Sequence, residues 1–305
     1  MTDDAAPEPR FSTISFLTDY GRADEFVGVV HSVIRSIAPD VRVIDITHEI
    51  DPHDVRAGGL ALARSVQYLA PGVVLGVVDP GVGTDRRSIA IEVGDGAAYL
   101  VGPDNGLFAP AVSLVGGAGR AFVLDNTAYH LHSPGPTFAG RDIFAPVAAH
   151  LCRGVAIEEL GTEIDVAKLL PGVLPVSQTD DDGAISGEVL WIDRFGNAQL
   201  NVDPDELSSW GEWVQVEGGR VTRTAQRAAT FADIPTGSVG LLVDSYGLLS
   251  VAVDRGSAAF ELELSEADRV TLRPSDGPKV PSTPVTLGQR PTTIPPEPGP
   301  PQEDC

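Results

Sequence analysis

The segment VVDPGVGTDRRSIAIEV, residues 77–93, places a carboxylate directly after an apolar strand. The strand pattern GVVLGVVD (72–79) is apolar on both faces, as the central strands of parallel sheets are. Asp79 ends this strand, and in an open parallel sheet the carboxyl end of a strand faces the crevice where ligands bind. Gly81 and Gly83 follow it and allow a backbone to approach a ligand closely. The segment therefore predicts a parallel α/β sheet with a ligand site beside Asp79.

Strand and helix patterns alternate on both sides of this segment. Further strands are predicted from STISFLT (12–18), VRVIDIT (41–47), SIAIEV (88–93), AYLVG (98–102) and AFVLD (121–125). Apolar residues at helical spacing predict helices in DEFVGVVHSVIRSIA (24–38), DVRAGGLALARSVQYL (54–69) and DIFAPVAAHLCRG (142–154). This alternation predicts an α/β domain with a mostly parallel sheet.

The pattern changes after about residue 165, where only short strands separated by turns follow. They are GEVLWID (187–193), AQLNV (198–202), WVQVE (213–217), SVGLLVD (238–244), LLSVAV (248–253) and RVTLR (269–273). Such strands predict a small antiparallel barrel or sandwich as the second domain. The expected organisation is a disordered N-terminus (1–11), an α/β domain (12–165), a linker (166–182), a β-barrel domain (183–275) and a disordered proline-rich tail (276–305).

Composition excludes several classes of partner. The formal charge of −22 over 305 residues repels nucleic acid and anionic membranes. The chain has no run of 18 apolar residues, and its start, MTDDAAPEPR, lacks the apolar core of a signal peptide. Its two cysteines, Cys152 and Cys305, provide no disulfide framework. We therefore expect a cytoplasmic protein that binds neither nucleic acid nor membranes.

Asp19 ends the first strand, in SFLTDYG (15–21), as Asp79 ends the third. Both carboxylates should face the same crevice, where Asp19 could accept two hydrogen bonds from the cis diol of a ribose. The alternative is that Asp19 caps the next helix, a role for which Asp24 and Glu25 are better candidates. Arg86 lies seven residues after Asp79, and a returning loop would bring the two together, either as a structural ion pair or around a water molecule.

Two further motifs have both a ligand-binding and a structural interpretation. His48 and His53, in ITHEIDPHD (46–54), fit no standard zinc spacing, so we expect structural histidines and no metal. In WIDRFGNAQLNV (191–202), Asp193, Phe195 and Asn197 surround a glycine. An acid, an aromatic ring and an amide could recognise an adenosine that carries an amine, although the same string also forms a good turn.

Taken in order, seven motifs identify a resemblance. They are SFLTDYG, DITHEIDPHDV, VVDPGVGTDRR, VGPDNGLF, PTFAGRDIFAP, IDRFGN and DSYGLLSVAV. Together they resemble the S-adenosyl-L-methionine (SAM) hydroxide adenosyltransferase family, also called SAM hydrolases, in the superfamily that contains the bacterial fluorinase and chlorinase. The resemblance covers roughly residues 12–275.

The resemblance implies both an architecture and a reaction. It implies a homotrimer in which SAM binds between the α/β domain of one subunit and the barrel of its neighbour. It implies that SAM and water give adenosine and L-methionine, by attack of water or hydroxide on the ribose C5′, without a metal or redox cofactor. It also implies roles for residues at matching positions. Asp79 and Arg86 would be catalytic, and Asp19 would bind the ribose. The methionine end of SAM would be bound by Asp24, Asp193, Ser245 and the backbone of Tyr246, and the adenine end by Phe195, Asn197 and the segment from Arg255 to Ser257.

Three differences from relatives bear on the reaction. Halogenating relatives carry tyrosine at the position of Asp79, and the fluorinase carries threonine at that of Val82. A carboxylate repels a halide at close range, so hydrolysis is expected. The typical hydrolase motif has histidine where this chain has Ala139, which removes one member of an Asp-Arg-His set unless His130 or His132 replaces it. The alternatives are a SAM-dependent halogenase and a SAM- or adenosine-binding protein with little catalysis.

Overall fold

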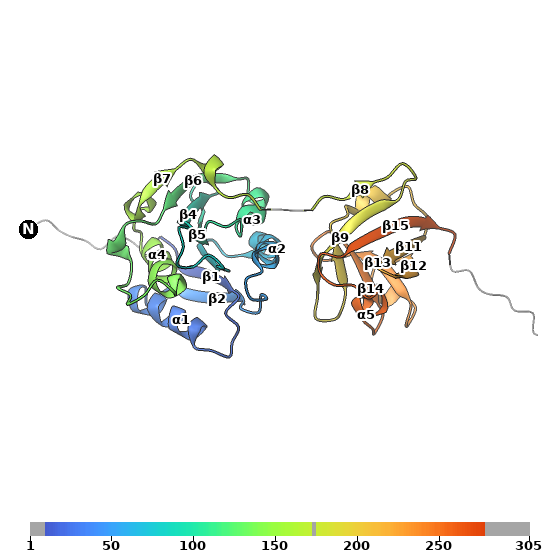
Figure 1. Cartoon of the computed structure of the whole chain (residues 1–305), viewed down its shortest axis with the longest axis horizontal. Coiled ribbons are helices and arrows are strands. Elements are labelled where there is room, and N and C mark those ends of the chain that lie inside the picture. The colour runs from blue at the N-terminus through green and yellow to red at the C-terminus, as the bar shows by residue number, and fades with distance from the viewer. Residues whose placement is uncertain (1–9, 173–174, 278–305) are drawn as a thin grey trace, which may run out of the picture.

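Two units follow one another along the chain, and the predicted fold class is confirmed (Figure 1). The computed structural model describes residues 10–172 and 175–277. An α/β domain with a parallel-rich sheet comes first, and a closed β-barrel follows it. Most of the two termini for which disorder is predicted, residues 1–11 and 276–305, lies outside the described residues.

The sheet of the first domain has the order β2-β1-β3-β5-β4-β6-β7. Its strands are β1 (Thr13–Thr18), β2 (Arg42–Thr47), β3 (Val73–Val77), β4 (Ser88–Val93), β5 (Ala98–Pro103), β6 (Ala118–Val123) and β7 (Thr162–Ile164). The pairs from β2 to β5 are parallel, whereas β4, β6 and β7 add antiparallel pairs at one side. In the parallel part, β1 and β3 are neighbours, with Thr18 opposite Val77. Asp19 and Asp79 therefore follow adjacent strands at the same edge of the sheet.

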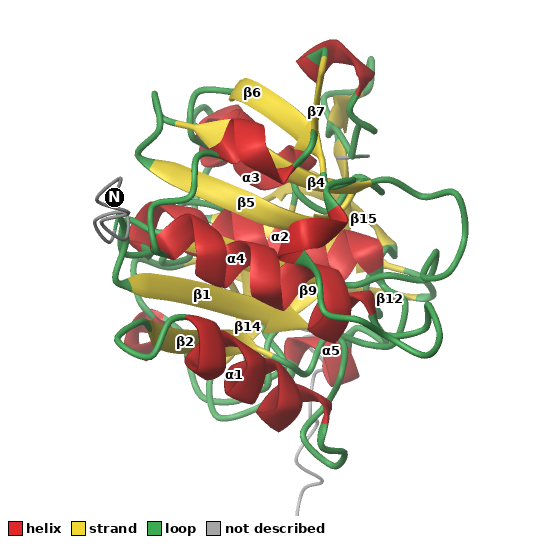
Figure 2. Ribbon diagram, turned by 90° about the vertical axis from the view of Figure 1, so that its left-hand side faces the viewer, coloured by secondary structure: helices red, strands yellow, loops and turns green. Residues whose placement is uncertain are grey.

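Helices cover both faces of this sheet (Figure 2). They are α1 (Phe26–Ile37), α2 (Val55–Ser65), α3 (Ala109–Leu114) and α4 (Ala145–Cys152), the last preceded by a π-helical turn, Gly140–Phe144. The pair α1 and α4 packs together over one hydrophobic cluster, and α2 and α3 pack together over the other. Asp54 caps α2, because its carboxylate accepts the Ala57 N–H at 2.8 Å.

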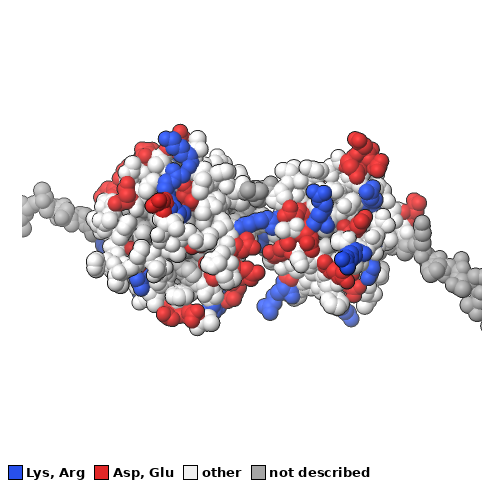
Figure 3. Space-filling model, viewed as in Figure 1, with Lys and Arg blue, Asp and Glu red and all other residues white. Residues whose placement is uncertain are grey.

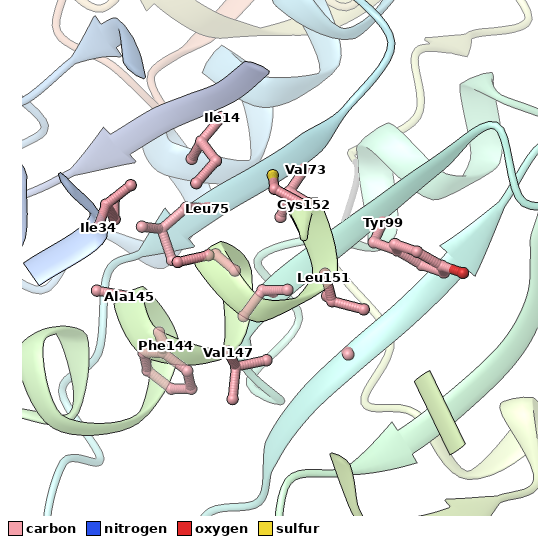
Figure 4. Packing of buried hydrophobic residues seen from close by; sticks show 14 of the residues in the cluster. Ile14, Ile34, Val73, Leu75, Tyr99, Phe144, Ala145, Val147, Leu151 and Cys152 are labelled. Atoms are coloured by element: carbon pink, nitrogen blue, oxygen red, sulfur yellow. The ribbon is translucent and has the colours of Figure 1, made fainter. Parts of the chain in front are cut away.

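Alternation along β1 explains why the domain has two cores. Ile14 and Phe16 point into the cluster under α1 and α4, whereas Leu17 points into the opposite cluster. Figure 4 shows the first cluster, in which Phe144 and the residues of α4 approach Leu75 of β3. Each fully buried side chain of this size contributes roughly 1.5–3 kcal/mol through removal from water. This packing fixes the strands whose ends carry Asp19 and Asp79.

The second domain is a barrel closed by seven strands in the order β10-β14-β13-β12-β11-β15-β9, with β8 added beyond β9. Its strands are β8 (Gln178–Thr179), β9 (Ile185–Ile192), β10 (Ala198–Leu200), β11 (Trp213–Gly218), β12 (Val221–Arg227), β13 (Val239–Val243), β14 (Leu249–Val253) and β15 (Arg269–Ser275). A short helix, α5 (Ala258–Glu261), follows β14. Pairing of β10 with β9 closes the ring, and an apolar cluster fills it.

One feature of the barrel differs from the antiparallel expectation. Strands β12 and β13 pair in parallel, with Ala225 opposite Val239. The reason is a crossover connection, residues 228–238, in place of a hairpin turn, so the chain re-enters the sheet in the same direction. The strand β12 itself was not expected from the sequence, because VTRTAQR contains few apolar residues.

Candidate functional site

The carboxyl ends of β1 and β3 open into a cavity of about 510 Å³. Asp19 and Asp79 both line it, as the strand pattern predicts. The remaining lining residues come from the end of β3, the start of α1, the loops after β1, β2 and β3, and the segment before α4: Tyr20, Phe26, Pro52, His53, Val77, Val82, Thr137, Phe138, Ala139, Gly140 and Arg141. Four separate segments of the first domain thus meet around the two carboxylates.

Asp79 and Arg86 form a bidentate ion pair. The Arg86 Nε donates to Oδ1 of Asp79 at 3.0 Å, and Nη2 donates to Oδ2 at 2.5 Å. A third nitrogen, Nη1, donates to the Ser88 hydroxyl at 2.8 Å and fixes the guanidinium from behind. The two side chains are only 6% and 11% exposed. The returning loop of residues 80–86 therefore holds a carboxylate in one orientation at the cavity wall.

Opposing influences act on the carboxyl group of Asp79. Burial raises the pKa of the Asp79 carboxyl above its ordinary value, because the charged form loses solvation. The Arg86 guanidinium and the Gly81 backbone N–H act in the opposite direction without cancelling the effect of burial, and Asp19 adds a small upward contribution. A buried carboxylate with a raised pKa and one fixed cation is suited to hold and polarise a water molecule.

The other arginine of the opening segment has a different partner. Arg87 pairs with the buried carboxylate of Asp104 and donates to the backbone oxygen of Lys168. Neither arginine lines the cavity itself, but Arg86 holds the carboxylate of Asp79, which does. Arg86 and Arg87 therefore serve separate parts of the domain although they are adjacent in sequence.

Asp19 is not a helix cap. Its Oδ2 accepts the backbone N–H of His53 at 2.9 Å, which ties the loop after β1 to the loop after β2. The N-cap residue of α1 is Glu25, and no side chain completes that cap. Asp24 is exposed and does not line the cavity that contains Asp19. Asp19 thus lines the cavity, whereas Asp24 does not.

An aromatic wall closes one side of the cavity and was not expected from the sequence. Tyr20, Phe26 and Phe138 contact one another edge to face, with ring centroids 5.2–5.8 Å apart. Burial, with the nearby carboxylates of Asp19 and Asp79, raises the pKa of the Tyr20 hydroxyl, so the ring stays neutral. Such rings offer their faces to a cation. The sequence contains Phe138 in the motif PTFAGRD, but nothing in that motif predicts its contact with Tyr20 and Phe26, more than 100 positions earlier.

Ala139 leaves the cavity without an imidazole at that position. It is 8% exposed and lines the cavity, whereas His130 and His132 do not. Among the described histidines, His53 lines the cavity, with its backbone in the left-handed region at φ 72°. His48 is fully buried and lies with His31 and Asp45 instead.

A second cavity, of about 930 Å³, lies in the barrel domain. Six residues predicted to bind substrate line it: Asp193, Phe195, Asn197, Ser245, Tyr246 and Arg255. The ring of Phe195 is 73% exposed, which is unusual for phenylalanine and leaves its face free for stacking. The barrel therefore carries a polar and aromatic site of its own.

The turn that carries Phe195 is braced by its neighbours. Asp193 Oδ1 accepts the N–H groups of Phe195 and Asn197 at 2.8 and 2.9 Å, and Oδ2 accepts the Asn197 amide at 2.8 Å. Gly196 has φ 82° and packs so closely against Ser257 that a Cβ would lie 2.0 Å from its Oγ. The turn and ligand-binding interpretations of this motif are thus compatible. Ser257 does not line the cavity and instead caps α5, accepting the Phe260 N–H at 3.1 Å.

Asp244 and Trp191 are among the lining residues of the barrel cavity that the sequence did not single out. Asp244 lines it and accepts the Gln199 amide at 2.5 Å, while its other oxygen accepts the Tyr246 N–H at 2.8 Å. Trp191 also lines it, and the Arg64 guanidinium of α2 lies 4.2 Å above its ring. The signal for Trp191 was its position two residues before Asp193, near the end of the predicted strand 187–193.

The cavity beside Asp79 and the cavity beside Phe195 have no lining residue in common. The first belongs to the α/β domain, and the second belongs to the barrel. Each domain therefore contributes a separate set of candidate ligand-binding groups.

Comparison with known proteins matches both domains. The chain is 44% identical over 259 residues to "(R)-S-adenosyl-L-methionine hydrolase" of Salinispora arenicola (strain CNS-205), covering 85% of this chain and 97% of that protein. It is 27% identical to the fluorinase of Actinoplanes sp. (strain N902-109), covering 85% and 96%. The crystal structure of an uncharacterized conserved protein from Thermotoga maritima superimposes with a TM-score of 0.79 at 35% identity, covering 85% of this chain and 99% of that one.

Family models agree with these matches and with the division into two units. Residues 14–161 match the SAM hydroxide adenosyltransferase N-terminal domain, and residues 187–271 match the corresponding C-terminal domain. The two matches span both cavities and most of the described chain. Together with the order of motifs and the confirmed fold, they show that this chain belongs to the SAM hydroxide adenosyltransferase family.

Proposed function

We propose that this protein hydrolyses S-adenosyl-L-methionine to adenosine and L-methionine. The observation that carries the proposal is the Asp79–Arg86 pair, buried at the wall of the cavity that also contains Asp19. A relative with 44% identity bears the name of this activity. The relative's name specifies the (R) form, and because "L" already describes the methionine carbon, we extend the proposal to the (R) configuration at sulfur.

In the proposed mechanism, Asp79 orients a water molecule on the face of C5′ opposite the sulfonium. A bond forms between the water oxygen and C5′ while the C5′–S bond breaks, and its electron pair neutralises the sulfonium as methionine leaves. The proton released from water passes to Asp79 and then to solvent. The leaving group is a neutral thioether and needs no general acid. Alignment of the two reactants can supply up to about 7–11 kcal/mol of the barrier reduction.

Substrate contacts follow from the lining of the two cavities. We propose that Asp19 binds the ribose hydroxyls and that Tyr20, Phe26 and Phe138 pack near the sulfonium. In the barrel, Phe195 would stack on adenine, and Asn197 would bond its edge. We propose that the methionine end of SAM is bound by Asp24, Asp193, Ser245 and Tyr246. The adenine end would also contact Arg255 and Ser257. Among these, Asp24 and Ser257 would need a neighbouring subunit or a backbone contact to take part.

We further propose a homotrimer in which the cavity beside Asp79 faces the barrel cavity of a neighbouring subunit. The support is that the two cavities share no lining residue within one chain. A ring of three such head-to-tail contacts would close on itself and give three equal sites. The reaction is proposed to need no resident metal or redox cofactor, and the cytoplasm is the proposed location. Within the described part of the chain, no helix combines the length and apolar character that crossing a bilayer requires.

Two alternatives make different demands on the same site. A halogenase would place an anion beside Asp79, where the carboxylate repels it and Val82 supplies no hydroxyl. A binding protein with little chemistry is favoured by Ala139, whose methyl group can neither orient water nor accept its proton.

The test is a chromatographic assay of the purified, untagged chain with each sulfur epimer of SAM, with and without chloride. We expect equal amounts of adenosine and methionine without halide, and faster release from the (R) epimer. A requirement for chloride, with a chlorinated nucleoside as product, would identify a halogenase. Calorimetric binding of SAM without any product would identify a binding protein and overturn the proposal.

A further inference from the structure

Three side chains of metal-binding type converge at strand β2, outside the lining of the cavity beside Asp79. They are His31 on α1, Asp45 on β2 and His48 just after β2. Asp45 Oδ1 lies 2.9 Å from Nε2 of His31 and 3.1 Å from Nε2 of His48. One ligand atom from each residue can be chosen so that all three lie within 4.8 Å of one another. Sequence spacing suggests His48 with His53, whereas the fold groups His48 with a histidine 17 positions earlier.

The Nε2 atom of His48 faces Asp45 at 3.1 Å, but it makes no hydrogen bond of acceptable geometry within the described residues. Its side chain is 0% exposed, and its Nδ1 lies 2.9 Å from the Thr18 hydroxyl oxygen, which also accepts the Tyr20 N–H. With Nδ1–H as the donor to Thr18, the lone pair of Nε2 points among His31 and Asp45. An unpaired buried nitrogen costs free energy unless something binds it.

We propose that His31, Asp45 and His48 bind a divalent transition-metal ion of the zinc class. Two imidazoles and one carboxylate form a common donor set for Zn²⁺. Ligand atoms on tetrahedral zinc lie roughly 3.3 Å apart, given metal–ligand distances near 2.0–2.2 Å. Two of the three separations in the cluster need to lengthen by only a few tenths of an ångström. His31 and Asp45 are 35% and 30% exposed, so solvent can reach the fourth position.

A plain hydrogen-bonded chain of the three residues explains less. It accounts for the His31–Asp45 contact, which has hydrogen-bond geometry, but not for the unpaired Nε2 of His48. The Thr18 contact has the form that metal-bound imidazoles usually have, in which the other ring nitrogen is held by an oxygen. Arg22, whose positive charge acts on His48, is 65% exposed and lies 3.9 Å from Glu49. Its solvated charge leaves the site open to a cation.

The location indicates what the ion would do. Thr18 immediately precedes Asp19, and the backbone oxygen of His48 accepts the Gly21 N–H at 2.7 Å. A bound ion would therefore connect α1 and β2 beneath two loops that line the cavity through Asp19, Tyr20, Pro52 and His53. It would stiffen the cavity without contacting the reacting atoms. The inference does not depend on the proposed hydrolysis, because metal binding is measured without substrate.

The experiment is a titration of the untagged, EDTA-treated full chain with Co²⁺, followed by its visible absorption, and then displacement by Zn²⁺ in a calorimeter. We expect one ion per chain and the intense absorption of tetrahedral cobalt. His31→Ala and Asp45→Asn should each abolish the band, while His132→Ala, at an exposed histidine outside the cluster, should preserve it. Thr18→Val, which removes the oxygen that holds Nδ1, should weaken binding by about 10–100-fold.

Absence of cobalt absorption in the wild-type chain, or a band that survives His31→Ala, would overturn the proposal. His31 is partly exposed, so its replacement should leave the fold intact, and near-ultraviolet circular dichroism checks this. Asp45→Asn gives a second, independent reading, because it preserves side-chain volume and removes only the charge. Loss of the band in both variants with an unchanged fold would establish the site.

Discussion

At the scale of single residues, Asp79 and Asp85 offer a matched pair of carboxylates. Both belong to the loop after β3, but Asp79 lines the cavity with Arg86 behind it, whereas Asp85 is exposed and does not line that cavity. We expect Asp79→Asn to lower kcat for adenosine release by about 10²–10⁴-fold, the usual effect of removing a group that accepts a proton in the rate-limiting step. Asp85→Asn should retain full activity. Equal turnover in the two variants would remove Asp79 from the mechanism.

The raised pKa of Asp79 predicts the position of the acid limb of kcat/KM. The proposed hydrolysis needs the ionised carboxylate. Activity should therefore rise over a pH range above that in which an ordinary aspartate titrates.

The same shift affects stability. In the pH window between the unfolded and folded pKa values of Asp79, the folded chain binds more protons than the unfolded chain. The stability due to this group therefore falls as pH rises through that window.

The same limb tests the role of Arg86. Its guanidinium lowers the pKa of Asp79, so Arg86→Gln should move the acid limb to still higher pH. Arg87→Gln, which removes the partner of Asp104, should leave the limb in place. Profiles of kcat/KM against pH for the three proteins provide the comparison, and coincident limbs for wild type and Arg86→Gln would contradict the proposed electrostatics.

Ala139 is the position at which this chain departs from the hydrolase motif. It lines the cavity, so a side chain placed there would reach the space beside Asp79. We expect Ala139→His to raise kcat, by up to ~10²–10⁴-fold if the imidazole accepts the proton of water. Ala139→Leu is the control for size without a nitrogen and should not raise it. An unchanged kcat in the histidine variant, with SAM binding intact, would mean that Asp79 and Arg86 suffice.

At the scale of elements, two glycines of the barrel separate backbone strain from packing. Gly196 and Gly247 both have φ 82°, but a Cβ at Gly196 would lie 2.0 Å from Ser257 Oγ, whereas nothing lies within 4 Å at Gly247. Gly247→Ala should cost about 1–2 kcal/mol of unfolding free energy from the left-handed backbone alone. Gly196→Ala should cost about 1–3 kcal/mol more, from overpacking between the turn and the cap of α5.

Urea unfolding followed by tryptophan fluorescence measures this difference. The three tryptophans of the chain, Trp191, Trp210 and Trp213, all lie in the barrel domain, so their signal reports on the unit that carries both glycines. Equal losses in the two variants would show that Ser257 does not brace the Phe195 turn. Because that turn presents Phe195 to the cavity, Gly196→Ala should also weaken SAM binding more than Gly247→Ala.

Elements also show which parts of the site could be predicted from the sequence. Asp19 and Asp79 were found because adjacent parallel strands must end at one edge, a rule that depends only on the strand pattern. The approach of Phe138 and the grouping of His31 with Asp45 and His48 depend on how helices pack, which no local spacing encodes. Strand β12 was missed because its two faces do not differ clearly in polarity, so its place in the barrel is set by its neighbours.

At the scale of the whole molecule, the overall charge affects which ligands the protein attracts. Acidic and basic side chains are interspersed over both domains on the face shown in Figure 3, although acidic residues outnumber basic ones by 43 to 21 in the chain. An excess of carboxylates attracts a cationic ligand such as SAM at long range.

The two domains contact each other through α2 and β9. There Arg56 Nη2 lies 2.6 Å from Glu188 Oε1, and the guanidinium of Arg64 lies over the ring of Trp191.

Mixing two impaired variants tests whether the halves of the site come from different chains. Asp79→Asn damages the cavity of the α/β domain, and Asn197→Ala damages the barrel cavity, which has no lining residue in common with it. If each site joins two chains in a ring, co-expression should restore activity, because about one quarter of the interfaces would combine an intact α/β domain with an intact barrel. Each variant alone should keep its low turnover. Should every site form within one chain, each mixed assembly would still contain only damaged sites, and adenosine release would stay at the level of the separate variants.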